Sequence, residues 1–186
     1  MSKLTLHPIS DAHDLVRPEQ APRYSLDSKA IQFFTDFFFV EPIVINSSLP
    51  AIKARNTMIR THVRLQLVVD DNMKFVGIIS SQDLSEQNIL SKSTLEHTLA
   101  AEFVVSDFMQ RKQDLLALSI HEIQDASIRN VIDFLKDNHQ QHCLVVDPEM
   151  KQVRGIFSAS DISRKLQLAI DIQEQSSFSK VHSALA

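Results

Sequence analysis

Apolar and polar positions follow the same order in two parts of the chain. Each part contains a continuous apolar run, at residues 67–69 and 143–146, which is followed by an aspartate and a polar turn. A second apolar run comes next and leads into a polar stretch that is typical of a helix start. Continuous apolar runs beside helical segments predict small sheets that are covered on at least one face by helices.

The similarity between the two parts extends along most of their length. Residues 67–85 align with residues 144–163 with one inserted residue, and roughly a dozen of the nineteen aligned positions are identical. Further upstream, residues 35–38 resemble residues 106–109. The chain is therefore predicted to contain two copies of one unit.

Each copy is expected to contain a helix, a strand, a helix, two strands and a final helix. In the first copy a short helix is expected near Ser28, and a β-branched strand at 43–45. Ser48 is expected to cap a helix at 48–60, which aligns with a helix at 125–137. Both helices carry an apolar stripe at helical spacing. The stripes are Ala51, Ala54 and Met58 in the first copy and Ile128, Val131, Ile132 and Leu135 in the second.

The domain boundaries follow from this repeat. The first copy is placed at 28–95 and the second at 96–170, between a polar N-terminal extension at 1–27 and a C-terminal tail at 171–186. A single unit of this size would be only marginally stable, so we expect the two copies to pack their sheets together. The predicted fold class is α/β (α+β), with two βαββα-type repeats.

Glycine is unusually scarce in this sequence. The chain has 2 glycines in 186 residues, where average usage would give about 13. Gly77 and Gly155 occupy the same position in the two copies, inside a predicted strand. A glycine in a strand usually marks a close approach by another backbone or by a ligand. We therefore expect such an approach at both positions.

Composition and charge exclude several classes of protein. The formal net charge of −4 argues against a nucleic-acid-binding protein that relies on a basic face. The single cysteine excludes an internal disulfide framework and favours a reducing compartment. No apolar run approaches the roughly 20 residues that span a bilayer, and the N-terminus lacks the pattern of a secretory signal. We expect a cytoplasmic protein with no membrane or nucleic-acid partner.

Over residues 28–170 the chain resembles a tandem pair of cystathionine-β-synthase-type (CBS) domains. The shared features are an apolar strand that ends in Val-Val-Asp, and then a glycine, two apolar residues, a serine, two variable residues and an aspartate. This signature stands at 77–83 and 155–161, and the opening motif of the family stands at 105–109. The resemblance implies two repeats with pseudo-two-fold symmetry and two clefts between them.

The resemblance also implies a regulatory module, not an enzyme, whose clefts bind AMP, ADP, ATP or S-adenosylmethionine as a regulatory ligand, with no required cofactor. In the family, the signature aspartate accepts hydrogen bonds from the ribose hydroxyls and the preceding serine contacts ribose or phosphate at a helix N-terminus. Strand residues at 43–45 and 116–118 would line an apolar slot for the adenine. The implied ligand-binding residues are Asp83, Ser80, Ser81 and Ile45 from the first copy and Asp161, Ser158, Ser160, Arg164 and Leu118 from the second.

The serine–aspartate spacing also has a purely structural explanation. Ser-x-x-Asp at a helix start is a capping box, which contributes about 1 kcal/mol of stability without a ligand. The copies differ three residues beyond the aspartate, where Arg164 follows Asp161 and Glu86 follows Asp83. A cation in the first turn opposes the helix dipole, so Arg164 is either a solvated surface charge or part of an anion site. Because Glu86 would repel phosphate, we expect the cleft that uses Asp161 to bind nucleotide better.

Other candidate chemistry is sparse. His139 and His142 have a spacing that can bind a metal on a helix face, but only Cys143 stands near enough to add a ligand, and no metal site is predicted. Cys143 begins an apolar strand and is expected to be a small buried hydrophobe. No nucleophile, base or metal constellation indicates an enzyme.

Two functions are consistent with these features. The first is a stand-alone regulatory module that senses an adenine nucleotide or S-adenosylmethionine and signals in trans to an unidentified protein target. The alternative is a ligand-free dimerisation or scaffold module. The family resemblance implies a homodimer in both.

Overall fold

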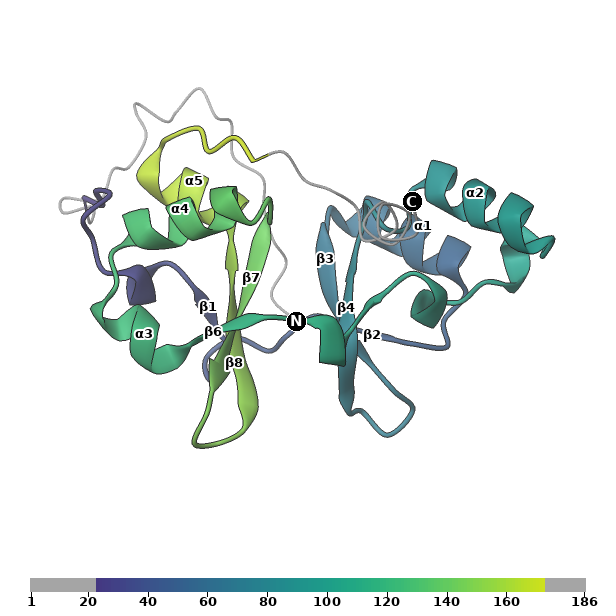
Figure 1. Ribbon diagram of the computed structural model, residues 1–186, viewed down its shortest axis with the longest axis horizontal. Coiled ribbons are helices and arrows are strands. Elements are labelled where there is room, and N and C mark those ends of the chain that lie inside the picture. Colours follow the sequence, from purple (N-terminus) through teal and green to yellow (C-terminus); the bar gives the residue numbers. More distant parts are fainter. Residues whose placement is uncertain (1–22, 173–186) are drawn as a thin grey trace, which may run out of the picture.

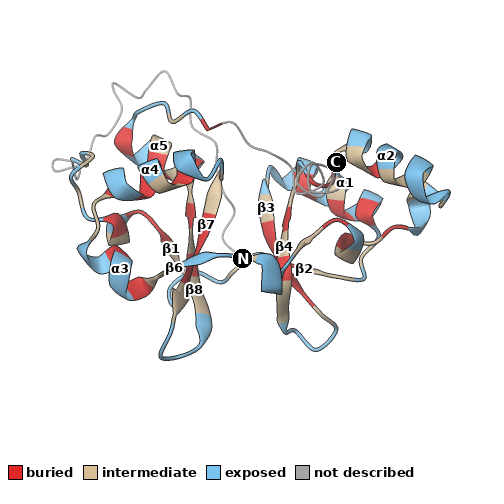
Figure 2. Ribbon diagram, in the orientation of Figure 1, coloured by how far each residue is buried: buried red, intermediate tan, exposed pale blue. Residues whose placement is uncertain are grey.

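The computed structural model describes residues 23–172, so the polar extension at 1–27 and the tail at 171–186 lie mostly outside the described residues. The described chain forms two lobes that lie side by side, each with a four-stranded sheet and its own helices (Figure 1). Buried residues gather where each sheet meets its helices, and the outer faces of the helices are exposed (Figure 2). The predicted mixed α/β fold is confirmed.

The first lobe comes mainly from the first repeat. Its sheet has the order β2-β3-β4-β5, and α1 and α2 lie along the same side of the lobe (Figure 1). Its elements are β2 (Val44–Asn46), α1 (Ala51–Thr61), β3 (Leu65–Val69), β4 (Phe75–Ser80), α2 (Glu86–Glu96), the short 3-10 helices η3 (Ala100–Glu102) and η4 (Val105–Asp107), β5 (Gln110–Arg111) and η5 (Lys112–Asp114).

The second lobe comes mainly from the second repeat. Its sheet has the order β1-β8-β7-β6. Its elements are the 3-10 helix η2 (Ala30–Gln32), β1 (Thr35–Asp36), β6 (Ala117–Ser119), α3 (Ile120–Asp125), α4 (Ile128–Asp137), β7 (His142–Asp147), β8 (Gln152–Ser158) and α5 (Ala159–Leu166).

Strand pairing confirms the repeat in detail. In both lobes a short strand runs parallel to a central strand, β2 beside β3 and β6 beside β7, and the central strand then pairs with its hairpin partner. A register shift falls between Val68 and Val69 in one lobe and between Val145 and Val146 in the other. The predicted helical stripes are buried in both lobes, on α1 and on α4.

The starts of four helices differ from the sequence-based prediction, including α4, which was expected from 125 and begins at Ile128 after its cap Ser127. The helix expected near Ser28 is only the 3-10 helix η2. Helix α1 begins at Ala51 after Pro50, because the backbone N–H and the hydroxyl of Ser48 both donate to Asn46 Oδ1 and hold a turn there instead of a cap. The last helix of the first repeat does not follow Ser80 directly. It begins at Glu86, where Ser85 Oγ accepts a hydrogen bond from the Asn88 N–H.

Each sheet is completed by a strand from the opening segment of the other repeat. Strand β1 lies in the opening segment of the first repeat but pairs with β8 of the second, and β5 lies in the opening segment of the second repeat but pairs with β4 of the first. The 3-10 helix η2 correspondingly packs against α3 and α4 in the second lobe. The lobes are therefore interlocked, and neither sheet is complete within one continuous repeat.

This pairing corrects the upstream alignment of residues 35–38 with 106–109. Thr35 lies opposite Ile156, and Gln110 lies opposite the equivalent Ile78. Thr35 therefore corresponds to Gln110, not to Ser106. The four-residue error arose because the run of phenylalanines at 33–39 matches the opening motif in several registers.

The expected close approach at both glycines is confirmed. A methyl group on Gly77 would lie 2.2 Å from the carbonyl oxygen of Gln110 in β5. On Gly155 it would lie 2.2 Å from the carbonyl oxygen of Thr35 in β1 and 2.7 Å from the Phe34 ring. Neither glycine has a positive φ. Both positions require space for the strand that each sheet receives from the other repeat, β5 beside Gly77 and β1 beside Gly155. We call these two strands the exchanged strands.

Other positions that usually favour glycine are occupied by larger residues. Helices α1, α2 and α5 end in the left-handed conformation at His62, His97 and Gln167, with φ of 54°, 52° and 55°. Glycine is common at such positions because it has no Cβ. The sequence has thus retained glycine where a Cβ has no room, and not where it would only ease the backbone conformation.

An ion pair also fixes β1 to the second lobe. Arg154 Nε and Nη2 donate to Asp36 Oδ1 and Oδ2 at 2.7 and 2.8 Å, and the guanidinium lies 3.7 Å from the centre of the Phe38 ring. The hydrogen bonds from Arg154 hold the pKa of Asp36 below its usual value. This ion pair therefore stabilises the fold above the usual pKa of aspartate, and the stabilisation is lost as pH falls through the lowered pKa.

Within residues 23–172, no helix is both long enough and apolar enough to cross a membrane.

We predict that Gly77→Ala and Gly155→Ala each lower the free energy of unfolding by about 1–3 kcal/mol or more, because the new methyl group collides with a backbone oxygen that cannot move alone. Urea unfolding followed by circular dichroism measures the change. Lys74→Ala, at an exposed turn of the same hairpin as Gly77, is the matched control and should change stability by less than about 0.5 kcal/mol. Wild-type stability in both glycine variants would contradict the exchange of strands.

Candidate functional site

Two clefts of similar size lie between the lobes. The first cleft, of about 520 Å³, is lined by Ser80 and Asp83 from one lobe and by residues of the α4–β7 connection from the other. The second cleft, of about 510 Å³, is lined by Ser158, Ser160 and Asp161 from the second lobe and by residues around β2 and β3 from the first. Each cleft thus receives the serine–aspartate signature of one repeat, as the pseudo-symmetry requires.

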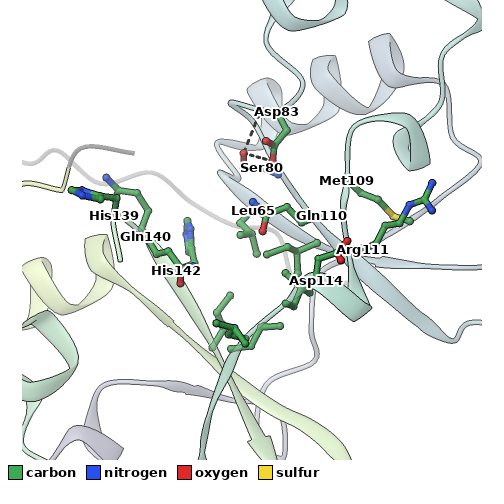
Figure 3. A pocket seen from close by; sticks show the side chains of 16 residues that line it. Leu65, Ser80, Asp83, Met109, Gln110, Arg111, Asp114, His139, Gln140 and His142 are labelled. Carbon is green, nitrogen blue, oxygen red and sulfur yellow. Dashed lines mark hydrogen bonds between the residues drawn. The ribbon is translucent and has the colours of Figure 1, made fainter. Parts of the chain in front are cut away.

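The carboxylate of Asp83 is bound within its own loop. Asp83 is 3% exposed. Its Oδ2 accepts hydrogen bonds from the Ser80 N–H at 3.0 Å and the Ser80 hydroxyl at 2.7 Å (Figure 3). The Asp83 N–H in turn donates to Ser80 Oγ at 3.1 Å. This reciprocal pairing is the capping-box pattern, here closing the turn at 81–84 rather than a helix.

Asp161 stands in a different environment. It lies in the first turn of α5, and Arg164 Nη2 donates to its Oδ1 at 2.8 Å. The hydroxyls of Ser158 and Ser160 lie 2.8 Å apart, and Ser158 makes no side-chain cap on the helix. The side chain of Asp161 is 37% exposed. The carboxylate and both hydroxyls are therefore accessible from the second cleft.

A second guanidinium reaches the second cleft from the opposite lobe. Arg64, in the connection between α1 and β3, lines this cleft together with Arg164. The Arg64 carbonyl accepts a hydrogen bond from the Ser81 N–H at 2.9 Å, which fixes the connection to the loop after β4. Arg64 could not be placed from the sequence, because only the packing of the two lobes brings it to the same cleft as Asp161.

The structure brings six of the nine predicted ligand-binding residues to the two clefts and places three elsewhere. Ser81 lines neither cleft. Ile45 is 7% exposed within the core of the first lobe, and Leu118 packs against the core of the second. Of the ranges 43–45 and 116–118 that were expected to line an apolar slot, only the first residue of each lines a cleft, Ile43 the second cleft and Leu116 the first. These residues precede β2 and β6, whose own apolar side chains are needed for the cores.

Charged residues next to the signatures also differ from expectation. Glu86 is paired with Arg55 at 3.5 Å and is not among the residues that line the first cleft. It therefore does not oppose an anion there, because the turn at 81–84 displaces α2. Lys165 Nζ donates to the Gln32 carbonyl at 2.7 Å and lies over the Phe33 ring. Of the two cations after Asp161, only Arg164 lines the second cleft.

Sequence reasoning missed the role of His142 as a cleft residue. His142 begins β7, and it lines both clefts together with Leu65 and Ile156. The pKa of His142 is lowered to about 4, chiefly by burial, while the negative charge of Asp161 raises it and the positive charge of Arg64 lowers it. The repeat alignment contains a signal, since His142 stands where the first repeat has the apolar Leu65. Within the described part of the chain, no group of three or more His, Cys, Asp or Glu side chains is placed to hold a metal.

Comparisons with known proteins point to one family. A family model for the CBS domain matches residues 36–87 and 105–168. No curated protein matches closely enough to be counted as a relative.

Solved structures share the fold at low sequence identity. An uncharacterised conserved protein from Pyrococcus horikoshii superimposes with a TM-score of 0.57 and 16% identity, over 80% of this chain and 98% of that one. The protein CBSX2 in complex with AMP superimposes with a TM-score of 0.53 and 22% identity, over 74% of this chain and 94% of that one. The CBS domain pair of protein MJ0100, in complex with 5′-methylthioadenosine and S-adenosyl-L-methionine, superimposes with a TM-score of 0.50 and 21% identity. The match covers 74% of this chain and 98% of that one.

We predict that the two signature aspartates differ in their effect on stability. Asp83→Ala removes the acceptor of two hydrogen bonds in a buried turn and should cost about 1–3 kcal/mol of unfolding free energy. Asp161→Ala, at a more exposed position, should cost less than about 1 kcal/mol. Urea unfolding of the two variants measures both, and equal losses would contradict the different roles that the structure gives them.

Proposed function

The chain belongs to the CBS domain family, and from this premise we propose that it is a regulatory module that binds an adenosine-containing ligand in the second cleft and signals in trans to a partner protein. One observation carries the proposal. The second cleft combines a partly exposed carboxylate, two hydroxyls and two guanidinium groups, contributed by both lobes. A ligand that contacts all of them would alter how the lobes are held together.

The chemistry of the second cleft suits a nucleotide. The Asp161 carboxylate can accept hydrogen bonds from both hydroxyls of a ribose. Arg64 and Arg164, with Ser158 and Ser160 at the start of α5, can bind a phosphate. Ile43 offers an apolar surface to a base. A volume of about 510 Å³ lies in the usual range for small-molecule sites.

Similar folds support the class of ligand. One of the similar structures is a complex with AMP, and another is a complex with 5′-methylthioadenosine and S-adenosyl-L-methionine. We propose that this chain binds a ligand of the same adenosine-containing class. The two guanidinium groups favour a phosphorylated member of that class over S-adenosylmethionine, which carries a positive sulfonium.

The first cleft is proposed as the weaker site. Asp83 Oδ2 already accepts two hydrogen bonds from Ser80, so a ribose would have to compete with them. Asp114 adds a second carboxylate to this cleft, against the single guanidinium of Arg111. A phosphate would therefore be repelled more strongly in the first cleft than in the second.

We propose that the module is not an enzyme and acts as a homodimer. Its output would then be a change in shape or association when the ligand binds. A partner protein that recognises one state of the module would receive the signal.

We predict that AMP binds the wild-type protein and that Asp161→Asn weakens binding about 10–100-fold, because the variant removes charge-assisted hydrogen bonds to the ribose. Isothermal titration calorimetry measures the affinity. Ser81→Ala, in the loop beside the first cleft, is the control and should change the affinity less than about twofold. An unchanged affinity in Asp161→Asn would contradict the proposed site.

The alternative function, a ligand-free scaffold, predicts a different thermal response. If the proposal holds, AMP or ATP at about 100 times its Kd stabilises the fold by about 2.7 kcal/mol, and differential scanning fluorimetry records a higher Tm. The Asp161→Asn variant should lose most of this shift at the same concentration. No shift in the wild type with AMP, ATP or S-adenosylmethionine would favour the scaffold.

A further inference from the structure

One titratable side chain stands between the two clefts. Of the residues that line them, only Leu65, His142 and Ile156 line both. His142 and Leu65 begin the equivalent strands β7 and β3, and Figure 3 shows them facing each other across the space between the lobes. In the register of β7 and β8, His142 lies opposite Ser158 of the second cleft.

Acidic, basic and imidazole side chains line the clefts on both sides of His142. The second cleft contributes Glu41, His62, Arg64, Asp161 and Arg164. The first contributes Asp83, Arg111, Asp114 and His139. Among them, Asp161 and Arg64 act on the imidazole most directly and in opposite directions.

The imidazole of His142 is neutral in the ligand-free protein. Burial and the nearby Arg64 disfavour its protonated form, which places its pKa at about 4. Within the described residues its ring makes no hydrogen bond that would fix its charge. Its protonation therefore depends on the charge that occupies the neighbouring clefts.

We propose that His142 is a specificity-determining residue, which takes up a proton when an anionic ligand occupies the second cleft and so favours phosphorylated over uncharged adenosine compounds. This inference rests on the proposed function of that cleft. A phosphate beside Arg64 and Arg164 offsets the positive charge that keeps the imidazole neutral, and adds a negative charge of its own. An uncharged nucleoside does neither.

The sign of the pH dependence follows from this linkage. A group that gains a proton on binding makes binding tighter as pH falls from the pKa of the complex towards the pKa of the free protein. Leu65, at the equivalent position of the other repeat, cannot titrate, so the effect belongs to one side of the pseudo-two-fold axis. Because the same imidazole borders the first cleft, its new charge also reaches Asp83 and Asp114.

The direct test follows the His142 imidazole by NMR during a pH titration of the wild-type protein alone, with saturating AMP and with saturating adenosine. His142→Gln identifies the signal by its loss. We expect AMP to raise the titration midpoint by about one pH unit or more, and adenosine to leave it unchanged. AMP that binds without moving the midpoint overturns this inference and leaves the proposed function intact. A protein that binds neither compound overturns both.

Affinity provides a second measurement. The ratio of wild-type to His142→Gln affinity for AMP should rise about twofold or more from about pH 8 to about pH 5, and the same ratio for adenosine should stay constant. Comparing variants cancels the titration of the AMP phosphate itself. His62→Gln, which removes another imidazole from the same cleft, should retain the wild-type pH dependence. If His62→Gln abolishes it and His142→Gln does not, the assignment to His142 is wrong.

Discussion

The contact between a glycine and an exchanged strand is the constraint on which the rest of the structure depends. At Gly77 and Gly155 the backbone of a strand from the other repeat approaches so closely that a Cβ would meet a carbonyl oxygen at 2.2 Å. Strands β5 and β1 complete the sheets only because this approach is possible. The exchange interlocks the lobes, and the interlocked lobes form the clefts. A hydrogen atom in place of a side chain therefore determines where the candidate sites lie.

Duplication of one unit has produced two clefts with different chemistry. In both, a serine–aspartate pair follows the hairpin strand that contains the glycine. In the first repeat the pair bonds to itself and closes a turn, which displaces α2 to a start at Glu86. In the second repeat α5 begins directly after Ser158, and Asp161 pairs with Arg164 at the cleft. The structural explanation of this motif thus applies to the first copy, and the ligand-binding explanation is proposed for the second.

Much of the fold could be predicted from the sequence because its signals are local. The two apolar central strands, the stripes on α1 and α4, and the glycine requirement were all visible in the repeat. The predictions that were wrong concerned positions where several local solutions compete. The phenylalanine run at 33–39 matched the opening motif in more than one register. The hydroxyl of Ser48, which was expected to cap α1, instead donates a hydrogen bond to Asn46 Oδ1.

By itself the sequence determined that the chain is a duplicated α/β unit, that two glycines needed space, and which serine–aspartate pairs were candidates for binding. These properties depend on residue type and spacing along one segment. Only the tertiary structure decided that Arg64 joins Asp161 in one cleft, that Ile43 and Leu116 alone of the ranges 43–45 and 116–118 line a cleft, and that His142 borders both clefts. Those placements arise where segments distant in sequence meet, and the spacing within one segment holds no information about them.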